Sequence, residues 1–402
     1  MRYERSLLGM FAGICRKRIA RSFPALLLIL LGSVVVVPAT PAYAVLAGFK
    51  TVQDSYGWVD FNGDGRTDHC QPYNDGLRCV LINGTGTGLG QLIVLTSTDK
   101  GYGRGRAWTD VNNDQRADYC RVVGGGSKSI QCTVSAGTAF GTTFTSGALD
   151  PGYDAGRAWA DFNGDGRADY CRVVGSWDKR AQCTLSTGTG FGQTITSGAI
   201  DPGWDAGRAW VDVNGDRRAD YCRVVNSAQL QCTVSSGGSF GQTFTSVTLD
   251  GGYDDSRKWA DFNGDGRADF CRNVGSVWYA YTNVRCTMST GANFGSEVTS
   301  PVTDAGYPGT VGWADVNGDG RDDHCRVTGG EIARCTLSTG TSFGATMNHP
   351  SDDVTIPGTH GWVDINGDGL ADHGFFYPGT PVTITLSTGT GWASNIYIPM
   401  PL

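Results

Sequence analysis

The chain has 402 residues, which fits two or three domains or one large repeat architecture. It contains 60 glycines, 36 Asp but only 3 Glu, and 26 Arg but only 6 Lys. Glu and Lys favour surface helices whereas Asp and Gly favour turns, so this composition excludes a mainly helical protein. The 11 Trp, 15 Tyr and 16 Phe exclude an intrinsically disordered chain, because such chains have little to bury.

The first 44 residues have the pattern of a secretory signal peptide. Basic residues from Arg16 to Arg21 precede an apolar run at 25–37, and the small-residue pattern Ala42-Tyr43-Ala44 follows. The run is shorter than the roughly 20 residues that a membrane span needs. We therefore predict cleavage after residue 44, a secreted mature chain of 45–402, and no membrane insertion. An uncleaved anchor is the alternative.

Removal of that segment changes the charge balance. It carries six basic residues and Glu4, so the formal charge falls from −7 to −7 − 5 = −12. Phosphate backbones would be repelled by such a net charge, so nucleic acid is excluded as a partner.

One motif explains the acidity. The pattern Asp-x-Asn-x-Asp-x-x-x-Asp occurs seven times, at intervals of 49 to 54 residues, and defines seven repeat units that fill 45–402. No separate catalytic domain fits beside them. The first Asp of each copy is Asp60, Asp110, Asp161, Asp212, Asp261, Asp315 or Asp364.

Each unit contains four short β-prone runs separated by turn residues. In the third unit these are the run around Trp159, residues 170–174, residues 183–186, and a Thr-rich run that begins at Phe191-Gly192. A Trp stands two residues before the first Asp in all seven units. Four strands repeated seven times predict an all-β, seven-bladed β-propeller, and a linear β-solenoid is the alternative.

The cysteines support pairing of the second and third strands. Cys15 leaves with the signal peptide, and the remaining twelve fall as pairs within units, as expected for an oxidising, extracellular setting. Their spacings are wrong for zinc, and no His pairs accompany them. The seventh unit has none, so we expect residues 45–53 or 395–398 to complete its blade. The predicted disulfides are Cys70–Cys79, Cys120–Cys132, Cys171–Cys183, Cys222–Cys232, Cys271–Cys286 and Cys325–Cys335.

The Asp loops have the composition of calcium sites. Side-chain oxygens stand at positions 1, 3, 5 and 9, and the backbone carbonyl at position 7 adds another, which suits Ca²⁺ better than Mg²⁺. Up to seven Ca²⁺ would offset the mature charge. Metal-free Asx turns are the alternative. The predicted ligands are Asp60, Asn62, Asp64, Arg66, Asp68; Asp110, Asn112, Asp114, Arg116, Asp118; Asp161, Asn163, Asp165, Arg167, Asp169; Asp212, Asn214, Asp216, Arg218, Asp220; Asp261, Asn263, Asp265, Arg267, Asp269; Asp315, Asn317, Asp319, Arg321, Asp323; and Asp364, Asn366, Asp368, Leu370, Asp372.

Position 6 of the loop needs a left-handed backbone, which glycine such as Gly166 adopts without strain. Gln115 and Arg217 replace this glycine in the second and fourth units. We expect these two loops to be the weakest sites.

The units resemble FG-GAP/VCBS-type repeats, the Ca²⁺-loop blades also found in the integrin α-subunit propeller and in a fungal seven-bladed lectin. The resemblance rests on Phe-Gly followed by Asp-x-Asn-x-Asp-Gly-x-x-Asp and covers essentially 45–402. It implies a propeller with metal loops. It does not choose between adhesion heads, lectins and accessory domains of secreted enzymes. The Cys pairs are not part of the general pattern and suggest a secreted bacterial subgroup.

The sequence predicts that the protein is not an enzyme. It contains no H-E-x-x-H and no G-x-S-x-G, and Glu297 and Glu331 are the only Glu of the mature chain. His69, His324 and His373 follow the last loop Asp, where other units have Tyr or Phe, so we expect them to pack in the core.

The segment before each Trp strand is the candidate ligand site. Units two to five carry an aromatic residue six positions before the Trp and an Arg two positions before it, a combination that recognises sugar rings. Packing between blades is the alternative. We predict multivalent, lectin-like glycan binding, with adhesion to a cell-surface protein as the alternative and a hydrolase or lyase as a less favoured one. The predicted ligand residues are Tyr102, Arg106, Tyr153, Arg157, Trp204, Arg208, Tyr253 and Arg257.

Overall fold

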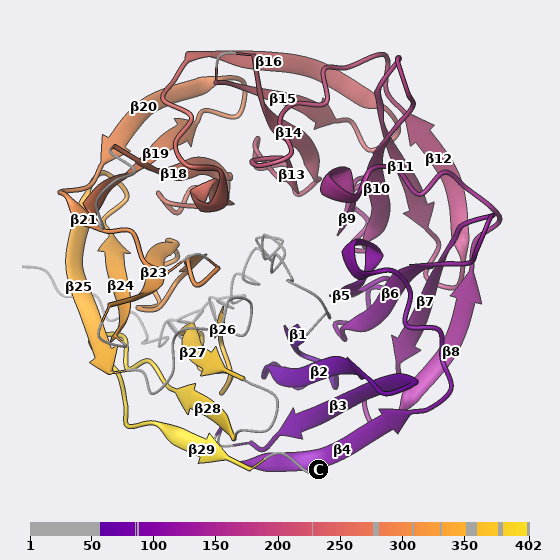
Figure 1. Cartoon of the computed structure of the whole chain (residues 1–402), viewed down its shortest axis with the longest axis horizontal. Coiled ribbons are helices and arrows are strands. Elements are labelled where there is room, and N and C mark those ends of the chain that lie inside the picture. The colour runs from indigo at the N-terminus through magenta and orange to yellow at the C-terminus, as the bar shows by residue number, and fades with distance from the viewer. Residues whose placement is uncertain are drawn as a thin grey trace, which may run out of the picture. The chain divides into compact units, whose positions relative to one another are not determined.

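Seven antiparallel sheets, each with four main strands in chain order, form the ring drawn in Figure 1 and confirm the predicted seven-bladed β-propeller. The computed structural model describes residues 57–399 except 85, 87, 227, 276–280, 308, 330–331, 351–359 and 377–380. The predicted signal peptide, residues 45–53 and Glu331 lie outside the described residues. The described residues belong to one unit of the chain, Pro41–Leu402.

The strands follow the predicted runs closely. Blades one to three consist of β1 Gly57–Val59, β2 Asp68–Tyr73, β3 Gly76–Ile82 and β4 Leu89–Leu95; β5 Ala107–Thr109, β6 Asp118–Val123, β7 Ser129–Ser135 and β8 Phe140–Thr145; and β9 Ala158–Ala160, β10 Asp169–Val174, β11 Arg180–Ser186 and β12 Phe191–Thr196. Blades four and five consist of β13 Ala209–Val211, β14 Asp220–Val225, β15 Gln229–Ser235 and β16 Phe240–Thr248; and β17 Lys258–Ala260, β18 Asp269–Val274, β19 Tyr281–Ser289 and β20 Phe294–Thr299, with β21 Thr303–Asp304 paired to β19. Blades six and seven consist of β22 Gly312–Ala314, β23 Asp323–Thr328, β24 Ile332–Ser338 and β25 Phe343–Pro350; and β26 His360–Val363, β27 Asp372–Phe375, β28 Val382–Thr385 and β29 Ile396–Ile398.

The first strand of each blade lies nearest the centre of the ring and the fourth lies at its outer rim (Figure 1). Short 3-10 helices, η1 Gly103–Gly105, η2 Asp154–Gly156 and η3 Asp254–Ser256, precede the first strands of blades two, three and five. Within the described residues, no helix is long and apolar enough to cross a membrane.

The core lies between neighbouring blades. Phe162, from the Asp loop of blade three, is fully buried against Trp210 and Phe240 of blade four, with ring centroids 6.5 and 4.8 Å away. Phe61 and Phe262 form the same aromatic group at two other junctions. An aliphatic residue takes this loop position at the rest and packs in one cluster with the Trp of the next blade, so the repeated Trp serves packing between blades. These aliphatic residues are Val111, Val213, Val316 and Ile365. His69 and His324 are buried against the Trp of their own blades, and His373 against Trp362, as predicted.

All six predicted disulfides are present within blades. Cys171 and Cys183 stand directly opposite each other in β10 and β11, with Cα atoms 4.1 Å apart, and the other five pairs have the same register. Six disulfides indicate an oxidising environment for the folded chain.

The seventh blade is completed by the C-terminal run, the second of the two predicted alternatives. β29 pairs with β28, so all four strands come from the segment that begins at His360. Blade seven therefore meets blade one through contacts between blades, and no strand is exchanged between these two described sheets.

Candidate functional site

Each Asp loop joins the first and second strands of its blade, and its first Asp organises the turn. In blade three, Oδ1 of Asp161 accepts hydrogen bonds from the backbone N–H groups of Gly164 (2.7 Å) and Asp165 (3.2 Å). Oδ2 accepts one from Gly166 (2.8 Å). The same bonds recur in all seven loops. The left-handed conformation expected at position 6 is present at Gly166, with φ +83°.

The two loops without glycine at position 6 adopt the same turn. Gln115 has φ 63° and Arg217 has φ 65°, which a side chain with a Cβ adopts only at a cost. Both loops keep the N–H bond to the first Asp, at 2.7 Å in each case. The turn is therefore retained at the expense of backbone strain. That these two loops are the weakest metal sites stays a prediction.

The arginine at position 7 was predicted only to offer its backbone carbonyl as a metal ligand, but its side chain also pairs with an Asp of the loop. The guanidinium of Arg167 forms an ion pair with Oδ2 of Asp165, and its Nε donates to the carbonyl oxygen of Ser186 at 3.2 Å. Asn163 Nδ2 also donates to Oδ2 of Asp165, at 2.8 Å. The corresponding Asp–Arg ion pair is present in the first six loops, whereas the seventh has Leu370 at this position.

The last Asp of each loop is fully buried. Asp169 accepts hydrogen bonds from the N–H groups of Phe162 (3.0 Å) and Ser186 (2.7 Å), and so ties the loop to the third strand. The pKa of Asp169 is raised to about 7, chiefly by burial and to a smaller extent by the nearby charges of Asp161 and Asp165. The raised pKa means that the buried charge of this carboxylate is not fully balanced by the hydrogen bonds and cations of the chain.

The loops match a hard cation in donor chemistry. Three carboxylates and one amide fall within nine residues, and these are the oxygen ligands that Ca²⁺ takes. Among the described residues, no three His, Cys, Asp or Glu side chains are gathered closely enough to hold a metal by themselves. A cation would therefore need the Asn amide and the backbone carbonyl as well, and it would compete with Arg167 for Asp165.

The loops also connect the blades, a role that the sequence analysis missed. The backbone carbonyl of the first Asp accepts a hydrogen bond from position 8 of the next loop, as from Ala219 N to Asp161 O at 2.7 Å. Six junctions share this bond. At the seventh, the Thr67 hydroxyl donates to the Asp364 carbonyl at 2.5 Å. The first carbonyls of the seven loops thus form a closed series of inter-blade bonds.

The predicted ligand aromatics lie in the segments that lead from one blade to the next. The Tyr153 side chain is 43% exposed, its hydroxyl donates to Gly175 O at 2.6 Å, and the Lys179 ammonium lies 3.7 Å from its ring centroid. Tyr102 has the same arrangement with Gly124 and Lys128. Each ring is therefore held in place by its polar end while one part remains open to solvent.

The aromatics of units four and five differ from this pattern. The ring of Trp204, 40% exposed, stacks with Arg257 at 4.8 Å, and Tyr253 donates to Gly275 O. The cation beside the ring is thus a lysine in units two and three and an arginine in unit four, and Tyr253 of unit five is more buried than the other three aromatics.

The predicted ligand arginines are occupied by the protein backbone. Arg157 donates to Pro151 O and Gly152 O, both at 2.8 Å, and pairs with Asp154 at 2.5 Å. Arg208 bonds the carbonyls of Pro202 and Gly203 in the same way, as Arg257 does for Gly251 and Gly252. Arg106 bonds Lys100 O and Gly101 O. These side chains stabilise the connecting turns, so most of their hydrogen-bond donors are used by the backbone.

A second set of arginines was not predicted at all. Arg172 is 2% exposed, and its guanidinium donates to Asp150 O (2.7 Å), Thr184 Oγ1 (2.9 Å) and Gln182 Oε1 (2.6 Å). The sequence signal was a Cys-Arg pair that recurs in units two to six. The corresponding buried residues are Arg121, Arg172, Arg223, Arg272 and Arg326.

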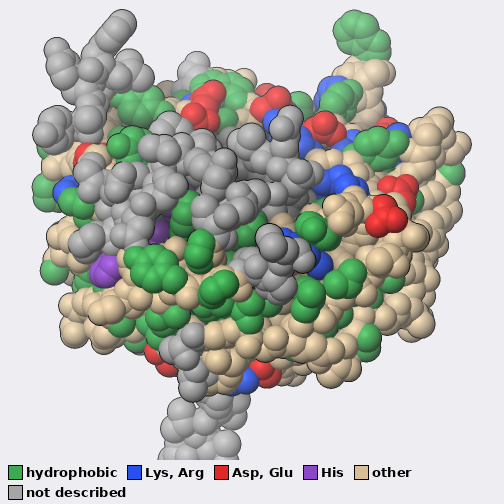
Figure 2. All heavy atoms as spheres, turned by 60° about the horizontal axis from the view of Figure 1, so that its bottom comes forward, with side chains coloured by type: hydrophobic (Ala, Val, Ile, Leu, Met, Phe, Trp, Pro, Cys, Tyr) green, Lys and Arg blue, Asp and Glu red, His purple; other side chains and the backbone are tan. Residues whose placement is uncertain are grey.

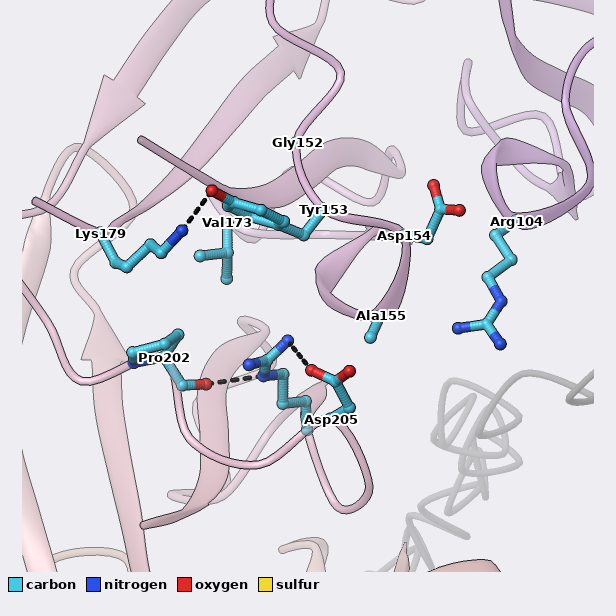
Figure 3. Close-up of a pocket in the computed structure, with 10 residues that line it drawn as sticks. Arg104, Gly152, Tyr153, Asp154, Ala155, Val173, Lys179, Pro202 and Asp205 are labelled. Carbon is cyan, nitrogen blue, oxygen red and sulfur yellow. Dashed lines mark hydrogen bonds and ion pairs between the residues drawn. The ribbon is translucent and has the colours of Figure 1, made fainter. Parts of the chain in front are cut away.

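A cleft of about 610 Å³ lies between the connections into blades three and four (Figure 3). Tyr153 and Asp154 line one side, Pro202, Asp205 and Arg208 line the other, and Lys179 and Arg104 also contribute. Two predicted ligand residues from different units, Tyr153 and Arg208, thus meet in one cavity. Figure 2 shows charged side chains of both signs interspersed along the upper edge of its view.

Comparisons with known proteins give limited matches. No family model matches the chain. The NAD(+)–arginine ADP-ribosyltransferase Chelt of Vibrio cholerae is 32% identical over 107 residues, which are 26% of this chain and 18% of that protein. The chain therefore matches less than a fifth of the length of this curated relative.

Among solved structures, a Photorhabdus luminescens Tc holotoxin pore has a TM-score of 0.48 and 15% identity, covering 82% of this chain and 15% of that one. The Dos1 propeller has a TM-score of 0.42 and 9% identity, covering 86% of this chain and 81% of that one. Scores at this level assign neither a family nor a function to the chain.

Proposed function

We propose that this chain is a secreted, calcium-binding propeller of the FG-GAP/VCBS type, which acts as a non-catalytic, multivalent carbohydrate-binding module. The observation that carries the proposal is the half-exposed aromatic ring repeated in the connecting segments of units two to four, best developed in the cleft beside Tyr153. An open aromatic face next to fixed polar groups is the arrangement that sugar rings use.

Calcium has a structural part in this proposal. The seven Asp loops each gather three carboxylates, and the loop bonds run between all neighbouring blades. A bound cation would offset the repulsion within each loop and so stiffen the junctions. The connecting segments would keep their spacing on the ring, which multivalent binding requires.

A non-catalytic role is supported by the way the carboxylates are used. Glu297 pairs with the buried Arg272 at 2.5 Å, and the loop Asp residues accept backbone hydrogen bonds. The Vibrio cholerae relative is named as an ADP-ribosyltransferase, but the matched stretch is a small part of that protein. We therefore assign no transferase activity to this chain.

A glycan array on the refolded, Ca²⁺-loaded protein tests the proposal. We expect binding to densely displayed glycans and much weaker binding to soluble monosaccharides, because several weak sites gain avidity. Tyr153→Ala should lower array binding without unfolding the protein. Tyr397→Ala, which removes a 55% exposed tyrosine from the outer strand of blade seven, is the matched control and should leave binding intact.

A protein partner is the second candidate, because the same half-open aromatics suit a protein interface. An array without any glycan signal, together with Tyr153-dependent binding to a cell surface stripped of glycans, would favour the adhesion or scaffold function. If Tyr153→Ala unfolds the blade, the ring is a packing residue and its exposed edge binds nothing.

A further inference from the structure

The cleft beside Tyr153 has an unusual set of charges. Three cations, Arg104, Lys179 and Arg208, and two carboxylates, Asp154 and Asp205, line it. They come from four segments. The connections into blades two and three supply Arg104 and Asp154, the second hairpin of blade three supplies Lys179, and the connection into blade four supplies Arg208 and Asp205. Figure 3 shows Lys179 and Arg104 at opposite ends of the cleft, with Tyr153 and Asp154 between them.

Both carboxylates are already paired with arginines. Asp205 pairs with Arg208 at 2.8 Å, and Asp154 pairs at 2.5 Å with Arg157, which is largely buried and does not line the cleft. These two ion pairs cancel in charge. The remaining charges are those of Arg104 and Lys179, so the cleft carries a net charge of about +2 although the mature chain is acidic.

The two remaining cations keep donors for a ligand. Among the described residues, no ion pair or hydrogen bond holds the exposed Arg104 guanidinium. The Lys179 ammonium donates to Tyr153 Oη and to Gly175 O, which uses two of its three N–H groups. One N–H of Lys179 and the whole Arg104 fork can therefore meet an anionic group, and the fork suits a carboxylate or a sulfate.

We propose that this cleft selects acidic oligosaccharides: a sugar ring lies on Tyr153 while its carboxylate or sulfate meets Arg104 or Lys179. This inference rests on the proposed carbohydrate-binding function and names the ligand class of one of its sites.

The same hairpin provides room for a second sugar. Trp177, two residues before Lys179, is 99% exposed, although a tryptophan side chain is among the most costly to leave in water. A ring bound there would lie next along the hairpin from the ring on Tyr153. The preferred ligand is therefore a chain of several acidic sugars and not a single residue.

The neighbouring position on the ring is an internal comparison. Between blades four and five, Ala155 stands where Arg104 stands in this cleft, and Trp204 replaces Tyr153. The corresponding hairpin, residues 226–228, has no lysine. Acid selectivity should therefore belong to the cleft between blades three and four, while a site at Trp204 would accept neutral sugars.

The test measures binding of soluble tetrasaccharides to the full-length, Ca²⁺-loaded protein by calorimetry. The probes are a hexuronate tetrasaccharide, a sulfated tetrasaccharide and a neutral tetrasaccharide. We expect at least one acidic probe to bind roughly tenfold more tightly than the neutral one, and the difference to shrink at about 1 M salt because exposed charges are then screened. The acidic probe that binds better identifies the anionic group.

The variants separate charge from packing. Arg104→Gln and Lys179→Gln should each weaken acidic binding about fivefold, which is the scale of an exposed ion pair, and should weaken neutral binding much less. Trp177→Ala should weaken binding of the acidic tetrasaccharide more than binding of an acidic disaccharide titrated in the same way. Arg180→Gln is the matched control: Arg180 belongs to the same hairpin but pairs with Asp178 and does not line the cleft, so binding should stay within twofold.

The outcomes distinguish the two proposals. Equal affinity for acidic and neutral probes, with Tyr153→Ala weakening both, would overturn acid selectivity and leave carbohydrate binding standing. Acidic binding that survives the Arg104→Gln/Lys179→Gln double variant would also overturn it. A blank glycan array together with no calorimetric signal would overturn both.

Discussion

Blades three and seven have the same four strands but are stabilised by different means. In blade three a disulfide joins β10 to β11, and the buried Arg172 bonds the connecting segment and the third strand. Blade seven has Gly374 and Phe375 at the positions of Cys171 and Arg172. It packs Ile365, Val382, Ile384 and Ile398 in a core that includes Trp58 of blade one. The comparison shows that the blade geometry does not depend on the covalent link or the buried charge.

The junction between blades three and four and the junction between blades seven and one also differ, in whether a serine bonds across them. The Ser235 hydroxyl bonds Phe162 O across the junction of blades three and four at 2.5 Å. Five further junctions have an equivalent serine. Where blade seven meets blade one, Ile82 takes the serine position and packs against the blade-seven core. The closing junction therefore lacks the serine bond of the other six junctions, and apolar packing at Ile82 takes its place beside the Thr67–Asp364 bond.

Calcium removal should have the largest effect if the loops bind it. A ligand that binds only the native state adds about 2.7 kcal/mol per site at 100-fold excess over its Kd. Excess EDTA should lower the Tm clearly, and Mg²⁺ should restore little. Asp165→Ala should cost more than Asp216→Ala, because the Arg217 loop is strained. An unchanged melting curve and no metal in elemental analysis would remove calcium from the proposal.

Reduction of the disulfides should affect blade seven less than the other six blades. Each closes a loop of 9 to 15 residues, worth about 2–3 kcal/mol in the chain-entropy model, and the contributions are not additive. Hydrogen exchange after reduction should therefore accelerate in the second and third strands of blades one to six and least in β27 and β28. Equal acceleration in all seven blades would show that the disulfides act on the ring as a whole.

Truncation of a buried ring at each junction should sharpen the contrast. Phe376→Ala, at the closing junction, and Phe162→Ala, between blades three and four, should each cost about 3–5 kcal/mol as buried Phe truncations do. We expect Phe376→Ala to increase exchange in both β1 and β26–β29, because Ile82 replaces the serine that bonds across the other junctions. Phe162→Ala should act locally, since the Ser235 bond and nearby disulfides remain. A reversed pattern would contradict the apolar closure.

The sequence was informative where a contact is local or periodic. Strand number, blade number and disulfide pairing all follow from spacings within one unit, such as Cys171 to Cys183. The function of Arg157 and Arg172 could not be read in this way. Arg157 bonds Pro151 O and Arg172 bonds Asp150 O. The positions of such backbone carbonyls leave no signal in the sequence, so it does not show whether an arginine faces a ligand or the backbone. The meeting of Arg104 with Lys179 in one cleft is likewise set by ring geometry across units.

The smallest expected effect concerns the one loop without an arginine. Leu370 packs against Gly318 and Gly389. In the sixth loop, Arg321 packs in the same way against the two corresponding glycines, Gly264 and Gly340. Leu370→Arg should therefore fit without rearrangement and pair with Asp368, as Arg321 pairs with Asp319. We expect a gain of about 0.2–1 kcal/mol in metal-free urea denaturation, reduced at high salt. Leu370→Met, which adds no charge, should show no gain.

In the presence of calcium the sign should reverse for that loop. The new guanidinium would compete with the cation for Asp368, so Leu370→Arg should lower the calcium affinity of the seventh site while it stabilises the empty one. Calcium titration of Leu370→Arg beside Arg321→Leu checks both directions, because removal of Arg321 should raise the affinity of the sixth site. If neither variant changes calcium affinity, the arginine does not share its carboxylate with the metal, and the Asp–Arg pairs are purely links between the loops and the third strands.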